Sequence, residues 1–266
     1  MRKDTRNTAI ALVAVLAVFG AAYVGVILYS GSSQPFYTVE SGSMMHSGNS
    51  KVGIIDTGDM VIVRDPSKVN IVTYVEGHET GYGKFGDFGD VVIYERAGST
   101  PVIHRAILYL ESNGDGTWNA PGLEHYSGEW SYFSGGVTYE DNGATDTRDP
   151  GSVKGALTFK NFGYKGETFS VDLNTITYTG GPEKGYITKG DNNPVTDGLL
   201  VPEERIVAIA AKEIPWLGCI KLFVTGSNTD RIPTNSVILL IIALAMIPAA
   251  IIGANFLYKT IKKEKE

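Results

Sequence analysis

The stretch TPVIHRAILYL, residues 100–110, places a histidine and an arginine inside a run of strand-forming apolar residues. Side chains alternate between the two faces of a β-strand, so we expect Val102, His104, Ala106 and Leu108 to share one face. A buried polar side chain needs either a hydrogen-bond partner or a function. The strand by itself therefore leaves two interpretations of His104 open, a satisfied core histidine and a functional group.

Similar short runs fill the middle of the chain. They are rich in Val, Ile, Tyr, Phe and Thr, and Gly, Asn, Asp and Pro separate them. The runs are DMVIVRD, FGDVVIYER, GALTFKNF, TFSVDLNTITYT, KGYITKGD and ERIVAIAAKEI. Helical periodicity is absent between the two ends of the chain. The sequence therefore predicts a mainly β domain.

Two stretches read as insertions between these strands. Residues 76–89, EGHETGYGKFGDFG, are expected to form a Gly-rich loop. Residues 112–183 are turn-dense and rich in Gly and Tyr, and SNGDGTW and YKGETF within them are typical of hairpin turns. This second stretch is expected to form a small β unit of its own.

Both ends of the chain are apolar. Residues 8–30 and 232–258 contain no charged side chain, and roughly 20 apolar residues suffice to cross a bilayer core. The first run could also be a cleaved signal peptide, but it exceeds the ~7–15 apolar residues of such a segment, which favours an uncleaved anchor. Pro248 in the second run is compatible with a membrane helix, because such helices accept kinks.

Positive charge flanks both runs on their outer sides. Arg2, Lys3 and Arg6 precede the first, and four lysines follow the second. By the positive-inside rule both tails are cytoplasmic and the segment between the runs is outside. The chain has a net charge of −6 and each tail +2, so the remainder carries −10. This acidic balance argues against a nucleic-acid-binding surface.

The single cysteine, Cys219, excludes an intramolecular disulfide. Its apolar neighbours IPWLGCIKLF favour a buried, inert thiol over a catalytic one, because no histidine is close in sequence. The surrounding stretch AKEIPWLGCIKLFVTG carries Trp216, Leu217 and Phe223. It fits either a surface in the membrane interface or a last core strand followed by an apolar loop.

A candidate nucleophile lies in SGSM, residues 41–44. Small residues around a serine let a substrate backbone approach, although such phrases also occur in linkers. A serine hydroxyl needs a base within hydrogen-bond reach to attack an amide. Of the four histidines, His78 and His125 lie in Gly-rich stretches, His46 follows Ser43 in an irregular stretch, and His104 lies in the strand.

A candidate third group lies in YITKGDNNPVTDG, residues 186–198, where Asp191 and Asp197 follow a short strand. An acid placed there would orient an imidazole and stabilise its charged form. A plain turn and a calcium loop are the alternatives. The EF-hand pattern is not met, since it requires Asp or Asn at Val195 and Gly at Thr196. We expect no metal and no cofactor.

The order of these motifs resembles that of type I signal peptidases of the archaeal and endoplasmic-reticulum class, over residues 1–75, 88–110 and 185–232. The resemblance implies that Ser43 is the nucleophile, His104 the general base, and Asp197 the acid that orients it. Asp191 matches a further important aspartate of the family. Ser41 stands where a hydroxyl helps the Ser43 amide to bind the oxyanion, and such donors stabilise the tetrahedral intermediate.

The resemblance also implies the domain organisation. Residues 1–35 would form a cytoplasmic tail and an N-terminal transmembrane anchor. A signal-peptidase-like catalytic β domain would comprise 36–111 and 184–231, with an inserted β-rich subdomain at 112–183. A second transmembrane helix at 232–258 and a cytoplasmic tail at 259–266 would complete the chain.

The implied function is a membrane-bound serine endopeptidase that removes signal peptides from secreted preproteins. Its partners would be these preproteins, the lipid bilayer and the protein-export machinery, with the catalytic domain on the outer side of the plasma or endoplasmic-reticulum membrane. A peptidase dedicated to a few surface or matrix proteins, and a non-enzymatic anchored β domain, are the alternatives. Ser43 lies 13 residues beyond Ser30 and so near the membrane.

The sequence departs from the family pattern in two places, one near Ser43 and one between strands. His46 stands where the family has a proline, and the 112–183 insertion is much longer than the usual connection. Because the insertion contains none of Ser43, His104 and Asp197, we expect it to be dispensable for the chemical step.

Overall fold

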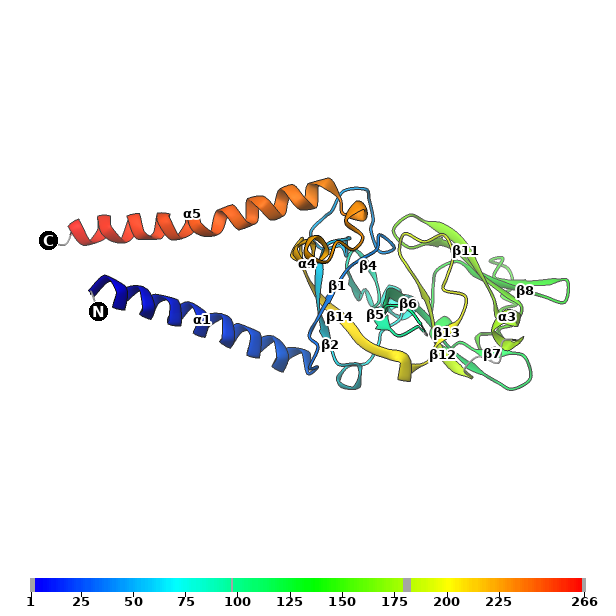
Figure 1. The fold of residues 1–266 in the computed structure, drawn as a ribbon. Helices are drawn as coiled ribbons and strands as arrows, with labels where there is room; N and C mark the ends of the chain where they lie inside the picture. Colours follow the sequence, from blue (N-terminus) through cyan, green and yellow to red (C-terminus); the bar gives the residue numbers. More distant parts are fainter. Residues whose placement is uncertain (1–2, 97, 179–182, 265–266) are drawn as a thin grey trace.

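A curled β-sheet forms the centre of the chain, shown in Figure 1. The computed structural model describes residues 3–96, 98–178 and 183–264. The sheet has the strand order β1-β2-β14-β5-β6-β12-β13, with β7 paired to β6. Its strands are β1 (Phe36–Thr38), β2 (Met60–Arg64), β5 (Val91–Tyr94), β6 (Val102–Ser112), β7 (Trp118–Asn119), β12 (Lys184–Lys189), β13 (Leu200–Val201) and β14 (Ile206–Ile214). The expectation of a mainly β domain is confirmed.

The alternation predicted for residues 102–108 holds only in part. Val102 and Ala106 pack in the same core cluster, whereas Leu108 belongs to a different one. The cause is a register shift, because Thr188 of β12 pairs with Ala106 while the preceding residue of β12 pairs with Leu108. This bulge changes the alternation within β6 after the position of His104.

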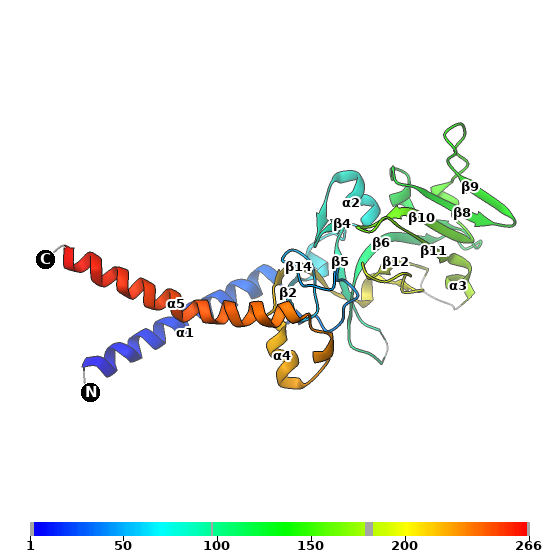
Figure 2. The same ribbon diagram turned by 90° about the horizontal axis from the view of Figure 1, so that it is seen from above.

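A second sheet, with the order β11-β10-β8-β9, lies at the end of the domain remote from the long helices (Figures 1 and 2). It comprises β8 (Trp130–Ser134), β9 (Val137–Glu140), β10 (Ala156–Phe162) and β11 (Glu167–Asp172). Both predicted hairpins are confirmed. SNGDGTW joins β6 to β7, and YKGETF lies at the turn between β10 and β11.

The insertion forms a four-stranded sheet of its own, as expected for residues 112–183, but it shares a hydrophobic core with the main domain. One core cluster combines Trp118 and Phe159 of the insertion with Tyr74, Leu108 and Ile187 of the main domain, all at most 3% exposed. Replacing the insertion by a short turn would expose this core to water. Positions 179–182 of the predicted insertion lie outside the described residues.

Three short helices occur where the sequence predicts none. They are α2 (Tyr74–Thr80), α3 (Leu173–Tyr178) and α4 (Gly218–Thr225). The expected loop at 76–89 contains part of α2 and a hairpin of β3 (Gly83–Lys84) and β4 (Asp87–Phe88). A capping box starts α2, since Thr73 and Glu76 satisfy each other's backbone amides. Single 3₁₀ turns lie at Pro66–Lys68, Pro121–Leu123, Pro150–Ser152, Glu203–Arg205 and Thr229–Arg231.

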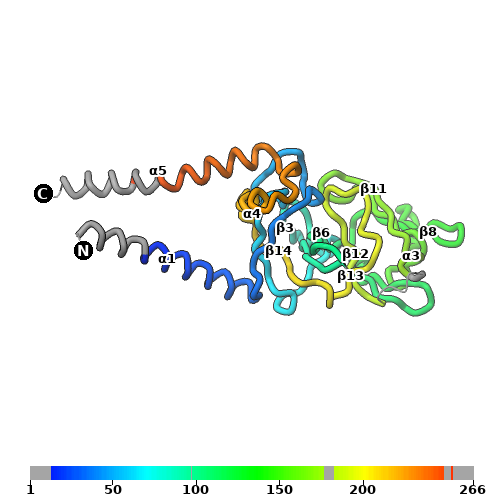
Figure 3. Tube along the Cα trace, in the orientation of Figure 1, coloured from blue at the N-terminus to red at the C-terminus, as the bar shows by residue number. Residues whose placement is uncertain are grey.

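Two long helices, α1 (Lys3–Ser30) and α5 (Thr234–Glu264), leave the domain on the same side (Figures 1 and 3). By length and composition α1 can cross a membrane over Val13–Ser30, of which only 6% is buried inside the protein. In the described part of α5, the apolar stretch Thr234–Pro248 is shorter than a membrane span. The basic tail residues that predict orientation lie outside the residues whose side chains are described.

Candidate active site

Ser43 lies in the loop that follows the edge strand β1. Backbone bonds tie the start of this loop to the main sheet, since the Val39 amide donates to the Asp59 carbonyl at 2.9 Å. The Met44 side chain is 1% exposed and anchors the loop in the core. The Oγ atoms of Ser41 and Ser43 lie 3.2 Å apart, at hydrogen-bond distance. The two hydroxyls are therefore adjacent on a partly buried surface.

His104 is buried on β6 opposite Val92 of β5, with 7% of the residue exposed. Its Nδ1 lies 2.7 Å from Oδ2 of Asp197. A carboxylate only accepts hydrogen bonds, so Nδ1 carries the proton and Nε2 is left as the acceptor. Both interpretations of His104 apply. Its Nδ1 has a hydrogen-bond partner, as in a core histidine, and Nε2 is left free to act on a substrate.

Asp197 is held by three donors at one oxygen. Besides the imidazole, the hydroxyls of Tyr94 and Thr188 donate to Oδ2 at 2.8 Å and 2.5 Å. Burial by itself would raise the pKa of Asp197, but the hydrogen bonds from His104, Thr188 and Tyr94 act against it, and the pKa lies below its usual value. The carboxylate is thus kept ionised beside the imidazole.

Gly190 brings the serine loop and the histidine together. A Cβ at this position would lie 2.7 Å from the Ser43 carbonyl oxygen and 2.9 Å from Nε2 of His104. The Ser43 backbone and the free face of the imidazole therefore meet across a glycine that leaves no room for a side chain. The Asn192 amide donates to the same Ser43 carbonyl at 2.8 Å and fixes its direction.

An open groove of about 580 Å³ runs past these groups. Ser41, Ser43 and His104 line it at one point. One wall is β1 with the residues before it, and the other is the start of β6. The groove ends near α4, where Lys221 pairs with Glu40 at 3.1 Å.

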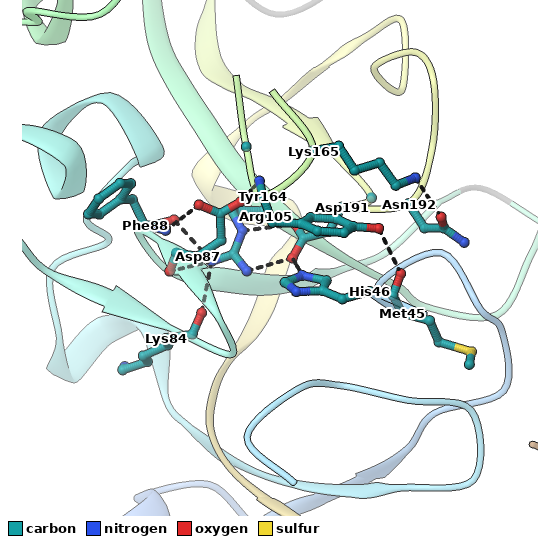
Figure 4. Close-up of polar contacts among 12 residues, drawn as sticks. Met45, His46, Lys84, Asp87, Phe88, Arg105, Tyr164, Lys165, Asp191 and Asn192 are labelled. Atoms are coloured by element: carbon teal, nitrogen blue, oxygen red, sulfur yellow. Dashed lines mark hydrogen bonds and ion pairs between the residues drawn. The ribbon is translucent and has the colours of Figure 1, made fainter. Parts of the chain in front are cut away.

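Of the two aspartates predicted for the site, Asp197 contacts His104 and Asp191 does not. Asp191 forms a two-point ion pair with Arg105, with Nε–Oδ1 at 2.8 Å and Nη2–Oδ2 at 2.6 Å. Its Oδ2 also lies 2.9 Å from Nε2 of His46, as Figure 4 shows. Burial opposes ionisation of Asp191, but the Arg105 charge and the His46 hydrogen bond lower its pKa below the usual value. Asp191 thus holds the serine loop through His46, three residues after Ser43.

No family model matches the sequence, and neither a curated protein nor a solved structure matches it. The fold and the arrangement of side chains at the site are therefore what indicates a function.

Four residues of this region are not among the sequence-predicted site residues: Arg105, Gly190, Asn192 and Tyr94. Arg105 carries a readable signal, because a charged residue directly after His104 in an otherwise apolar strand must be paired if it is buried. Gly190 and Asn192 belong to the KGDNN stretch. Both residue types are common in turns, so the sequence does not indicate their contacts with a loop about 150 residues earlier. Tyr94 is an ordinary strand residue by pattern, and only the fold brings it to Asp197.

Cys219 and potential metal ligands lie apart from these groups. Burial raises the pKa of the Cys219 thiol to about 11, with the nearby Asp59 charge acting in the same direction, so the thiol stays protonated. It is fully buried at the start of α4. In the described ranges, no group of three or more His, Cys, Asp or Glu side chains is arranged to hold a metal ion.

Proposed function

We propose that this protein is a membrane-bound serine endopeptidase of the signal-peptidase type, which removes signal peptides from secreted preproteins. The observation that carries the proposal is the position of the His104–Asp197 pair. The imidazole nitrogen that is not bonded to Asp197, Nε2, faces the backbone of Ser43 across Gly190, and the groove is lined by both His104 and Ser43. A binding domain has no need for this combination of groups.

The proposed reaction is acyl transfer. Nε2 of His104 takes the proton from the Ser43 hydroxyl as its oxygen attacks the substrate carbonyl carbon. The carboxylate of Asp197 stabilises the imidazolium that forms. The imidazolium then gives the proton to the departing amine as the C–N bond breaks. A water molecule, activated in turn by His104, hydrolyses the ester on Ser43.

The oxyanion of the tetrahedral intermediate needs donors aimed at it. The Ser43 backbone amide and the Ser41 hydroxyl are the proposed donors. Ser41 is now 3.2 Å from Ser43 Oγ, so its hydroxyl lies beside the atom that attacks. It has to turn from Ser43 to the substrate oxygen when substrate enters.

The substrate is proposed to bind as an extended strand. Strand β1 is at the edge of the large sheet and pairs with β2 on one side only. Its other side borders the groove. An incoming peptide can add to such an edge through main-chain hydrogen bonds, which would place a peptide bond next to Ser43.

The membrane location is proposed from the arrangement of helices around the groove. Helix α1 ends at Ser30 and β1 begins at Phe36, so the groove starts a few residues from the end of the candidate span. Helix α4 lies at the same end of the domain (Figure 1) and exposes Phe223 by 50% and Val224 by 83%. We further propose that α5 is a second anchor, with both tails on the cytoplasmic side.

A preprotein cleavage assay tests this function. Membranes that contain the protein are mixed with a reporter carrying an N-terminal apolar signal segment, and the N-terminus of any shortened product is sequenced. The proposal expects one cut just after the apolar segment, and no product with membranes that lack the protein. Intact, folded protein that leaves the reporter uncut would favour a non-enzymatic surface domain. Cleavage restricted to one or two native surface proteins would favour a dedicated peptidase.

A further inference from the structure

The turn between β10 and β11, in the insertion, reaches the loop that carries Ser43. The aromatic rings of Tyr164 and His46 stack face to face, with centroids 3.7 Å apart and planes 8° apart. The Tyr164 hydroxyl donates to the Met45 carbonyl at 3.2 Å. Figure 4 shows the Tyr164 ring above the His46 ring and the Tyr164 hydroxyl joined to Met45. The insertion therefore contacts the two positions that follow Met44.

Lys165, the next residue of the same turn, is linked to Ser43 through Asn192. Lys165 Nζ donates to the side-chain oxygen of Asn192 at 2.9 Å. The Asn192 side chain donates to the Gly42 carbonyl at 3.2 Å, and its backbone amide donates to the Ser43 carbonyl at 2.8 Å. The serine loop is thus held directly by Tyr164 after Ser43, and by Asn192, which Lys165 contacts, at Gly42 and Ser43.

The turn is itself fixed to the main domain. The Tyr164 amide donates to Oδ2 of Asp87 at 2.9 Å, and the Gly163 amide donates to the Tyr74 hydroxyl at 3.0 Å. The buried Arg105 guanidinium donates to the carbonyls of Lys84, Phe88 and Gly89, next to Asp87. These contacts give the turn a rigid base, so Tyr164 acts as a support and not as a mobile cover.

We propose that Tyr164 is a positioning residue, through which the insertion holds the Ser43 loop at its working distance from His104. The proposal rests on the proposed peptidase function and extends it to the insertion. Tyr164 has no role in proton transfer, because its contacts are with His46, Met45 and Asp87. Tyr164 therefore affects the reaction only through the position of Ser43.

The expected signature follows from that role. A displacement of about 1 Å in a reacting group costs up to ~100-fold in rate, so Tyr164→Ala should lower kcat by about 10- to 100-fold. KM should stay within about twofold, because the groove walls are untouched. Tyr164→Phe keeps the stacked ring and loses one hydrogen bond, so it should restore activity to within about fivefold of the unsubstituted protein. The pH at which kcat is half-maximal should not move, because the His104–Asp197 pair is intact.

The matched control is Tyr139→Ala. Tyr139 belongs to the same insertion and stacks on Tyr132 at 4.5 Å, but it lies on β9, away from the serine loop. It should lower the melting temperature of the protein as much as Tyr164→Ala does and leave kcat unchanged. Equal loss of kcat in the two variants would overturn the proposal, because the insertion would then act only through stability.

An activity-independent measurement separates this proposal from the proposed function. Backbone amide hydrogen exchange of the segment 41–47 in the full-length protein should be at least tenfold faster in Tyr164→Ala than in Tyr139→Ala. If exchange is faster in Tyr164→Ala but the unsubstituted protein has no peptidase activity, the proposed function is wrong. The proposal that Tyr164 holds the loop then still stands. Unchanged exchange in a folded Tyr164→Ala variant would overturn the proposal whatever the activity is.

Discussion

Replacing Asp197 by asparagine should mainly lower activity, whereas replacing Asp191 by asparagine should mainly lower stability. Asp197 contacts the imidazole of His104 and lowers the energy of its charged form, whereas Asp191 neutralises the buried guanidinium of Arg105. We expect Asp197→Asn to abolish most activity in a stable protein. We expect Asp191→Asn to give an unstable protein whose remaining folded fraction keeps more of its activity.

The magnitude for Asp197→Asn comes from its charge. Two unit charges about 4 Å apart interact by about 4 kcal/mol at an effective dielectric constant of about 20. Loss of that interaction in the transition state corresponds to about a 10³-fold lower kcat. The amide oxygen of asparagine can still accept from Tyr94 and Thr188, so the free energy of unfolding should change by only about 1 kcal/mol.

The magnitude for Asp191→Asn comes from burial. Arg105 is 1% exposed, and removal of one partner from a buried ion pair costs about 3–5 kcal/mol. The lower end applies, because three backbone carbonyls still accept from the guanidinium. An asparagine also keeps one acceptor oxygen.

Two measurements on each purified variant decide the matter. Urea unfolding followed by circular dichroism gives stability, and cleavage of a short signal-sequence peptide gives kcat per folded molecule. The role of Asp197 is refuted if Asp197→Asn retains kcat within tenfold. The role of Asp191 is refuted if Asp191→Asn is as stable as the unsubstituted protein. Equal effects of the two changes on both quantities would contradict the division of roles.

Three further changes test the site and its surroundings. His104→Lys should be inactive in the same peptide assay at neutral pH, because the Asp197 carboxylate would keep the ammonium group protonated; turnover within tenfold of normal would contradict this. Gly190→Ala should lower kcat at least tenfold, since its Cβ would lie 2.7 Å from a backbone oxygen of the nucleophile loop, whereas Gly48→Ala, with open space around it, should not. Burial raises the pKa of Asp59 to about 7, so its ionisation opposes folding and urea stability should fall from about pH 4 to pH 7, by at most about 4 kcal/mol. Asp59→Asn should flatten this dependence, and an unchanged slope would show that another group causes it.

Local pattern predicts the strands of the main domain well. The runs that contain β2, β6, β10, β12 and β14 combine strand-forming residues with turn residues on either side, and each forms a strand. Residues 173–178, LNTITY, form the helix α3 although Thr, Ile and Tyr favour strands. Tertiary packing decided this, because Leu173 is buried at 1% and Ile176 at 2% in the shared core.

The residues predicted for the site can be located in the fold, and their catalytic roles stay predictions. Ser43 and His104 line one groove, and Asp197 bonds to His104 on the side of Nδ1. The roles of Asp191 and the insertion were not readable, because they depend on contacts between positions that are 27 to 145 residues apart in sequence. A stack of Tyr164 on His46 leaves no trace in either local segment.

The central claim is that Ser43 is the nucleophile of a signal-peptide-cleaving enzyme. The most direct measurement compares Ser43→Ala with Ser47→Ala, a change in the same loop whose hydroxyl bonds only locally to Asn49. Both proteins are inserted into membranes, checked for folding by their melting temperatures, and given the same preprotein. The account predicts that Ser47→Ala processes the preprotein at the normal rate and that Ser43→Ala yields no shortened product. Processing by Ser43→Ala at a rate close to that of Ser47→Ala would contradict it.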